Sequence, residues 1–256
     1  MLTALLIITL LSFSSTLPLF LLFTKKYSTI KVHKLVLSVS STLSVFINLL
    51  LIDSNIIRYS FYLSILWSFF LLFITIVSWK QRNINLIQIL LISILGIINF
   101  SIISFLLINL NFQSILILIF GGLILSNSCF SLIVGHSYLD DVDLPISLIK
   151  NINRIFFSMV VLRFILDLIV ISFYNVEIFN YQIPIYEFIF GYEGIFLWTA
   201  FFFGIIFPIF LSFLSHKTIN IESTLSATGL LYVLVVCVFM GSLIFNYYAI
   251  QFKIFL

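Results

Sequence analysis

Charge is what this chain lacks most. Only 8% of its 256 residues are Asp, Glu, Lys or Arg, against roughly a quarter in soluble domains, whereas 62% are hydrophobic. Its mean hydropathy of +1.29 is equally far from that of a soluble domain. The chain is therefore expected to be an integral membrane protein, with the lipid bilayer as its solvent.

Further absences exclude other classes of function. The sequence contains no phosphate-binding loop and no GxGxxG, HExxH or CxxC motif, so common nucleotide, zinc-protease and thiol-redox sites are not predicted. His33 and His216 fall in connecting stretches, which excludes a bis-histidine haem held by this chain alone. Cys129 and Cys237 lie in apolar runs and are expected to be buried small side chains. Loop topology accounts for the net charge of +3, so no nucleic-acid partner is expected.

Long apolar runs are what the sequence has instead. A helix that crosses the hydrocarbon layer needs about 20 mainly apolar residues, roughly twice the length of a barrel strand. In lipid, a helix satisfies its own backbone hydrogen bonds. We therefore predict a single integral membrane domain over residues 1–256, an all-α bundle of eight transmembrane helices at about 2–23, 35–52, 59–79, 86–108, 114–138, 155–173, 194–214 and 227–249.

Lysine and arginine are distributed unevenly between the two faces of this bundle. Arg58 and Lys253 lie on one face, and nine basic residues follow the odd-numbered spans on the other: Lys25, Lys26, Lys31, Lys34, Lys80, Arg82, Lys150, Arg154 and Lys217. By the positive-inside rule, the face with nine is cytoplasmic. Both termini are therefore expected outside.

Two segments of the second half are expected to depart from straight transmembrane helices. The outer connection at 174–193 is rich in Tyr and Phe, and a short amphipathic helix or re-entrant loop is predicted there, with Tyr186 and Tyr192 at headgroup level. Pro208 removes a backbone hydrogen bond within the seventh span and should kink it.

The stretch VLRFILDLIV, residues 161–170, places Arg163 and Asp167 four positions apart in an apolar run. This spacing puts both side chains on one helix face, where they can form an ion pair, and places them about 12 and 18 Å below a span start near Ile155. A lone charge at that depth costs at least about 2.5 kcal/mol, so the face should point into the bundle. The pair either pins this span to its neighbours or lines a cavity for a quinone, a proton path or an anionic solute.

The fifth predicted span provides a plausible opposite wall. Ser126, Asn127 and Ser128 form the most polar triplet at mid-membrane depth. We predict that Ser126 and Asn127 join Arg163 and Asp167 in a proton path or polar cavity. The alternative is that they form hydrogen bonds between helices.

His136 and Tyr138 lie at the cytoplasmic end of the same span. His136 can donate a hydrogen bond to a quinone carbonyl near the interface, so these two residues are a candidate quinone site. His136 also shares a helix face with Asp140, and a histidine together with carboxylates can bind a divalent metal ion. A histidine at a helix C-terminus is already favoured by the helix dipole, however, and no metal site is predicted.

Short segments of the chain resemble an uncharacterised group of bacterial polytopic membrane proteins. These are GHSYLDDVDLP at 135–145, with a G-H-x-Y-L turn, and STLSATGLLYV at 223–233, with an S-A-T-G-x-L-Y-V start to the last span, together with LIKNINR at 148–154. They make up about a tenth of the chain. The resemblance implies a bacterial inner membrane rather than a mitochondrial one, and it implies no activity.

Three functions are compatible with these features. We favour a membrane subunit of a redox or energy-converting complex, which contributes a quinone or proton site while other membrane subunits hold the metal centres; such a chain is not catalytic on its own. A structural or assembly subunit without a ligand comes next, because the first four spans are nearly devoid of polar groups. A small-solute transporter comes last, because spans 1–4 and 5–8 show no convincing repeat.

Overall fold

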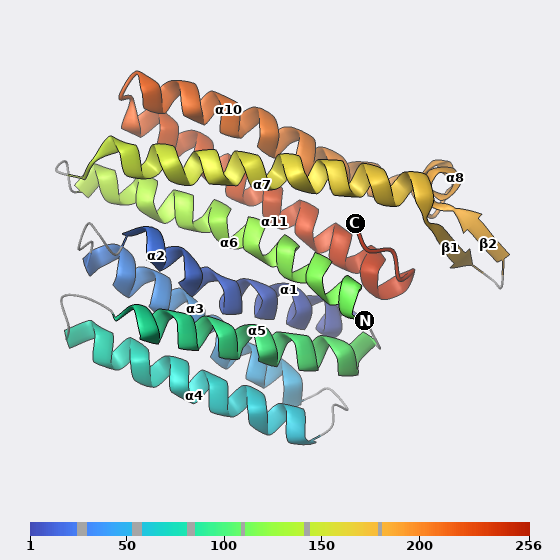
Figure 1. The fold of residues 1–256 in the computed structure, drawn as a ribbon, viewed down its shortest axis with the longest axis horizontal. Coiled ribbons are helices and arrows are strands. Elements are labelled where there is room, and N and C mark those ends of the chain that lie inside the picture. Colours follow the sequence, from blue (N-terminus) through green and yellow to red (C-terminus); the bar gives the residue numbers. More distant parts are fainter. Residues whose placement is uncertain (25–29, 53–57, 81–84, 109–110, 141–143, 179–180) are drawn as a thin grey trace.

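The protein is a bundle of helices that lie side by side along one axis (Figure 1). The structure is a computed structural model, and it describes residues 1–24, 30–52, 58–80, 85–108, 111–140, 144–178 and 181–256. Eight of its helical segments are long and apolar enough to cross a membrane, which confirms the predicted all-α bundle of eight spans.

Six spans are single helices and two are interrupted. The single helices are α3 (Ile30–Ile52), α4 (Arg58–Lys80), α5 (Leu86–Ile108), α6 (Phe112–Asp140), α7 (Ile146–Phe173) and α11 (Thr224–Gln251). The first span joins α1 (Leu2–Thr16), a 3-10 turn (Leu17–Phe20) and α2 (Leu21–Thr24). The seventh joins α9 (Ile195–Phe201), a π-helical turn (Phe202–Ile206) and α10 (Phe207–Asn220).

Both termini lie at the same end of the bundle (Figure 1). The C-terminal ends of α2, α4, α6 and α10 gather at the opposite end, next to the N-terminal ends of the helices that follow them. Of the nine lysines and arginines in the described residues, six belong to helix segments at that opposite end, which we call the basic end: Lys31, Lys34, Lys80, Lys150, Arg154 and Lys217. Which end faces the cytoplasm stays a prediction.

Several spans extend further toward the basic end than predicted. α7 begins at Ile146 rather than near residue 155, because Leu148, Ile149 and Ile152 are buried and continue its packing face through a polar stretch. His33, predicted in a connecting stretch, lies inside α3 with its Nε2 atom 3.1 Å from Thr24 Oγ1. Hydropathy finds the apolar part of a helix, whereas packing and hydrogen bonds extend it.

Proline accounts for both interruptions. Pro18 lies in the 3-10 turn and Pro208 at the start of α10, directly after the π-helical turn. A proline has no N–H to donate and its ring clashes with the carbonyl four residues earlier, which is that of Gly204 for Pro208. The structure thus interrupts the regular α-helix directly before Pro208, whereas the predicted kink itself stays a prediction.

The connection between α7 and α9 folds into a small cap. Strand β1 (Asn175–Ile178) pairs antiparallel with β2 (Tyr181–Pro184), and α8 (Ile185–Phe190) follows. The short helix was predicted, but the hairpin was not, because its strands of four residues show no contrast with the apolar sequence around them. Tyr186 and Tyr192 are 50% and 95% exposed on this cap.

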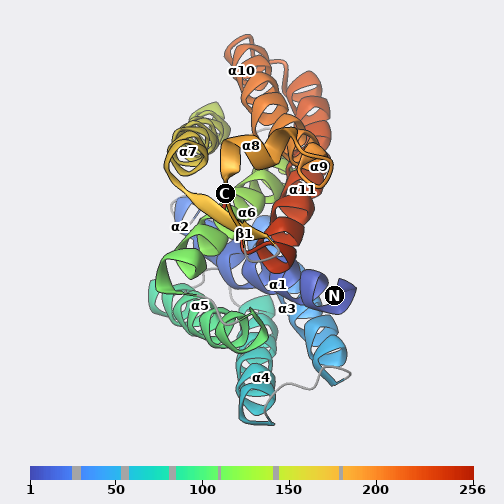
Figure 2. The same cartoon turned by 90° about the vertical axis from the view of Figure 1, so that its right-hand side faces the viewer.

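The helices form three layers along the vertical direction of Figures 1 and 2. Helices α3, α4 and α5 form the lowest layer, α1 and α6 the middle one, and α7 and α10 the uppermost, while α11 runs obliquely from the uppermost layer down to the middle one. The first span is the most enclosed, with 72% of its apolar window buried. Helix α6 packs on both α1 and α11, and therefore connects the two halves of the molecule.

Candidate functional site: an ion pair between two cavities

Arg163 and Asp167 form the predicted intrahelical ion pair. The Arg163 Nε atom donates to both carboxylate oxygens of Asp167, at 3.1 and 3.3 Å. The two residues are only 6% and 1% exposed, so the face of α7 that carries them points into the protein. Neither charge is therefore presented to lipid.

The guanidinium of Arg163 has partners on two further helices. Its Nη1 atom lies 3.5 Å from the carbonyl oxygen of Ile117 in α6, and its central carbon lies 5.2 Å from the ring centre of Phe245 in α11. A Cβ atom on Gly121 would lie 3.2 Å from Nη1, so a glycine at this position leaves room for the guanidinium. Arg163 thus ties α7 to α6 and α11.

The pair lies in the half of α7 that leads to the hairpin, because the helix extends further at its other end than the sequence indicated. Because α7 spans 28 residues, it is about 42 Å long, and Arg163 and Asp167 lie about 15 and 9 Å from its last residue, Phe173. The predicted position of the pair around the membrane midplane stays a prediction.

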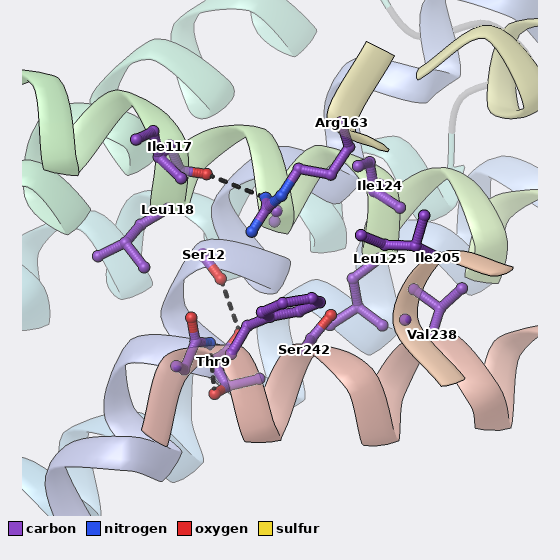
Figure 3. A pocket seen from close by; sticks show the side chains of 15 residues that line it. Thr9, Ser12, Ile117, Leu118, Ile124, Leu125, Arg163, Ile205, Val238 and Ser242 are labelled. Atoms are coloured by element: carbon purple, nitrogen blue, oxygen red, sulfur yellow. Dashed lines mark hydrogen bonds between the residues drawn. The ribbon is translucent and has the colours of Figure 1, made fainter. Parts of the chain in front are cut away.

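A small cavity, which we call the central cavity, lies on one side of Arg163 (Figure 3). It leaves about 30 Å³ for a water-sized molecule, and about 10 to 15 Å³ is enough for one water. It is lined by residues of α1, α6, α7, the π-helical turn and α11: Thr9, Ser12, Ile117, Leu118, Gly121, Gly122, Ile124, Leu125, Arg163, Gly204, Ile205, Val238, Ser242, Phe245 and Asn246.

The wall opposite Arg163 is polar, as Figure 3 shows. Asn246 Nδ2 donates to Thr9 Oγ1 at 2.9 Å, and Ser12 Oγ donates to the Thr9 carbonyl at 2.9 Å. Ser242 adds another hydroxyl to the lining. Sequence analysis missed these four residues, although Thr9, Ser12 and Ser15 at intervals of three would have indicated a polar stripe on the first span.

A second opening, which we call the side cavity, lies on the other side of the ion pair. It has a volume of about 150 Å³ and is apolar except for the two charged residues. Leu116 and Leu166 at its rim are 49% and 42% exposed, so it reaches the outer surface of the bundle. Its lining is Leu116, Ile117, Phe120, Arg163, Leu166, Asp167, Val170 and Phe255.

Ser126 and Asn127, predicted to join the ion pair, bind other partners. Ser126 Oγ lies 2.7 Å from Thr16 Oγ1 and donates to the Phe13 carbonyl at 3.1 Å, so it connects α6 to α1. Asn127 Nδ2 approaches the Met159 sulfur at 3.5 Å. Neither residue lines the two cavities beside the ion pair. A part of Ser126 and Asn127 in a proton path stays a prediction.

His136 and Tyr138 lie near the basic end of α6, away from the ion pair. His136 is exposed, whereas Tyr138 is buried and its hydroxyl donates to the Pro145 carbonyl and accepts from the Ile149 N–H at 3.4 Å. Tyr138 thus holds the start of α7. A quinone site at these two residues stays a prediction.

The described residues contain no group of three His, Cys, Asp or Glu side chains placed to hold a metal ion. The side chain of Asp140 and residues 141–143 lie outside the described part of the chain. Cys129 and Cys237 are free thiols, half-buried and buried respectively. Comparison with protein families, with curated proteins and with solved structures finds no match for this chain.

Proposed function

We propose that the chain is a membrane subunit of an energy-converting complex and that it carries protons through its bundle by way of Asp167. The observation that supports this most is the place of the ion pair between the side cavity and the water-sized central cavity. Buried carboxylates inside membrane bundles are typical of proton relays, because a carboxylate can take up and release a proton without leaving its place.

The residues between the side cavity and the central cavity have side chains suited to a proton relay. Asp167 would accept a proton from the side cavity and release it to a water molecule in the central cavity when the Arg163 side chain moves aside. Arg163, which lines both cavities, would keep its charge and its contacts with the Ile117 carbonyl and the Phe245 ring. Water in the central cavity would then connect to the hydroxyls of Thr9 and Ser12. The Thr16–Ser126 contact continues the polar line along α1 toward the basic end.

The size of the openings favours protons over larger cargo. Sites for small molecules usually occupy about 300 to 1,000 Å³. The central cavity, with about 30 Å³, is too small for a quinone ring or most solutes, and the side cavity, with about 150 Å³, is below the range for whole ligands in this conformation. A quinone site at His136 and Tyr138 is therefore a separate proposal for the other end of α6.

Proton flux into liposomes that contain the purified protein tests the proposal. With a potassium diffusion potential and a pH-sensitive dye inside, the wild type should acidify the lumen faster than protein-free liposomes. Asp167→Asn should reduce the flux to background, because the amide keeps the shape but cannot exchange a proton. Glu187→Gln, the same change on exposed α8, should conduct like the wild type. Equal fluxes in the Asp167→Asn variant and the wild type would contradict the proposal.

Membership of a complex needs its own measurement. Purification in a mild detergent should recover the chain with other membrane subunits, and an absorption spectrum of the product should show haem or flavin bands from those partners. Recovery of a lone, colourless protein would count against an energy-converting complex.

One observation favours a structural role as the second candidate. Arg163 is satisfied by Asp167, Ile117 and Phe245 without any ligand, as a residue that merely pins three helices would be. Replacing both charges, as Arg163→Leu with Asp167→Leu, distinguishes the two. A double variant that folds and supports full activity of its complex would establish the structural role, whereas a folded but inactive one supports the relay.

We place the protein in a bacterial inner membrane with both termini outside. The bacterial assignment is supported by the resemblance of 135–145 and 223–233, and the orientation by the basic residues at one end. A membrane-impermeant thiol reagent should label Tyr192→Cys, at the hairpin end, from outside intact cells. Thr218→Cys should react only after the cells are opened. The reverse pattern would invert the orientation.

A further inference from the structure

A third opening lies between α7 and α10, near the basic end of the bundle. It has a volume of about 210 Å³, and its lining combines two basic side chains, two phenyl rings and two small polar residues: Asn153, Arg154, Phe157, Ser212, Phe213 and His216. We call it the α7–α10 pocket. It contains none of the residues of the proposed proton path.

The polar floor of this pocket is already hydrogen bonded. Asn153 Nδ2 donates to the Ser212 carbonyl at 2.9 Å, and Ser212 Oγ donates to Asn153 Oδ1 at 3.0 Å. Both residues are buried, and their bonds hold α7 against α10. The donors that can turn to a ligand are therefore those of Arg154 and His216 above the floor.

These donors favour an anion. Arg154 is exposed and forms no ion pair with any carboxylate in the described part of the chain. Lys217 adds a positive charge nearby, with its Nζ atom 4.5 Å from the ring centre of Phe213. A guanidinium offers two parallel N–H groups that match the oxygens of a phosphate.

The phenyl rings indicate that this anion has a hydrocarbon tail. Phe157 and Phe213 are 37% and 48% exposed and lie on the two helices that flank the opening. Arg154 lies eight residues, or about 12 Å, from the first residue of α7. At this position the methylene groups of its side chain stay in the apolar layer of the membrane while the guanidinium reaches the membrane interface. A free phosphate ion would offer no apolar surface to the Phe157 ring or to the rest of the Phe213 ring.

We propose that the α7–α10 pocket binds the phosphate of an anionic phospholipid through Arg154 and His216, while an acyl chain lies outside the opening along the exposed faces of Phe157 and Phe213. Basic pockets between transmembrane helices bind anionic headgroups in this way, and the cytoplasmic leaflet supplies such lipids. The bound lipid joins α7 to α10 at the level of the Asn153–Ser212 contact.

Native mass spectrometry of the purified protein tests this proposal with short-chain lipids. Dioctanoyl phosphatidylglycerol should bind at one copy per chain and more tightly than dioctanoyl phosphatidylcholine at equal concentration. Arg154→Gln should weaken this binding about tenfold, the change expected when one charge-assisted hydrogen bond is lost. Lys150→Gln removes the same charge one turn earlier on α7, outside the pocket, and should leave the affinity unchanged.

Four results would overturn the proposal. Equal binding of the two lipids would mean an unselective apolar surface, and equal losses in Arg154→Gln and Lys150→Gln would mean diffuse charge attraction. Full displacement of the lipid by inorganic phosphate at similar concentration would mean a site for a soluble anion. Wild-type affinity in Arg154→Gln would exclude the assigned residue, and because Arg154 is exposed, this variant should fold normally, as an unchanged melting temperature without lipid would verify.

Discussion

Helix α7 carries two arginines, nine residues apart, in opposite surroundings. Arg163 is 6% exposed, bonded to Asp167 and placed over Phe245, whereas Arg154 is exposed beside an open pocket and has no described carboxylate partner. The first can keep its charge inside the bundle only because a carboxylate is present. The second lies near the interface, where no such partner is needed.

The two arginines differ in the free energy needed to keep a charge at each position. That free energy, rather than the charge alone, indicates the role of each residue. An unpaired charge deep in a membrane bundle is strongly destabilising, so buried charges occur as pairs. Such a pair either holds helices together or forms part of a functional site. An exposed arginine has little effect on folding and is free for a ligand. The two positions should therefore respond in opposite ways to substitution.

The largest effect is expected from breaking the buried pair. Arg163→Leu or Asp167→Leu alone should lower the free energy of unfolding by about 3 to 5 kcal/mol, because each leaves one buried charge unpaired. The double variant should be nearly as stable as the parent. Unfolding in increasing fractions of SDS measures all three, and an Asp167→Leu protein as stable as the parent would show that the pair contributes nothing.

The next effect concerns the support behind Arg163. The backbones of Gly204 and Gly241 touch, and Phe245 packs beside Gly204 while its ring lies under the guanidinium. Gly241→Ala should cost about 1 to 3 kcal/mol, because the new methyl group overlaps the π-helical turn. Gly229→Ala, on the same helix with nothing within 4 Å, should be neutral or stabilise by up to about 1 kcal/mol. Equal effects of the two substitutions would show that the close approach is not present.

A smaller effect is expected from the polar wall that faces Arg163. Asn246→Ala removes a hydrogen bond to Thr9, and such bonds in membrane bundles are worth about 0.6 kcal/mol on average and about 1.7 at most. Asn246→Ala combined with Thr9→Val should lose less stability than the sum of the two single losses, because the shared hydrogen bond is lost only once. Additive losses in this double-mutant cycle would mean that the two side chains do not interact.

The smallest effect is expected at Arg154. Arg154→Gln should change the free energy of unfolding by less than about 0.5 kcal/mol in detergent without lipid, as exposed substitutions usually do. A variant that is as stable as the parent but no longer binds anionic lipid would separate the role of Arg154 from that of Arg163. A loss as large as that of Arg163→Leu would mean that Arg154 has a structural partner after all.

The sequence was enough to predict what depends on hydropathy and local spacing. The eight spans follow from apolar runs, and the Arg163–Asp167 pair follows from a separation of four residues on one helix. The contacts that these residues make with other helices could not be predicted from the sequence. Ser126 was expected near Arg163, but it bonds to Thr16, since the rotation of α6 is set by close packing at Gly121 and Gly122.

Long-range neighbours were the least predictable. The polar wall of the central cavity joins Thr9 to Asn246, and no pattern within either span indicates the other. The start of α7 was predicted too late in the sequence because its first turns contain many polar residues. Those turns nevertheless bury Leu148, Ile149 and Ile152 against neighbouring helices. Packing against distant segments decided both features.

The first span has a consequence for how the molecule is made. It leaves the ribosome before the seven spans that follow it here, yet its hydroxyls meet their partners only when Ser126 and then Asn246 follow, 110 and 237 residues later. Until then Thr9, Ser12 and Thr16 can bond only to carbonyls of their own helix, as they also do in the finished bundle. Those local bonds let the span stay in lipid without unsatisfied hydroxyl groups until α11 is inserted and completes the wall of the central cavity.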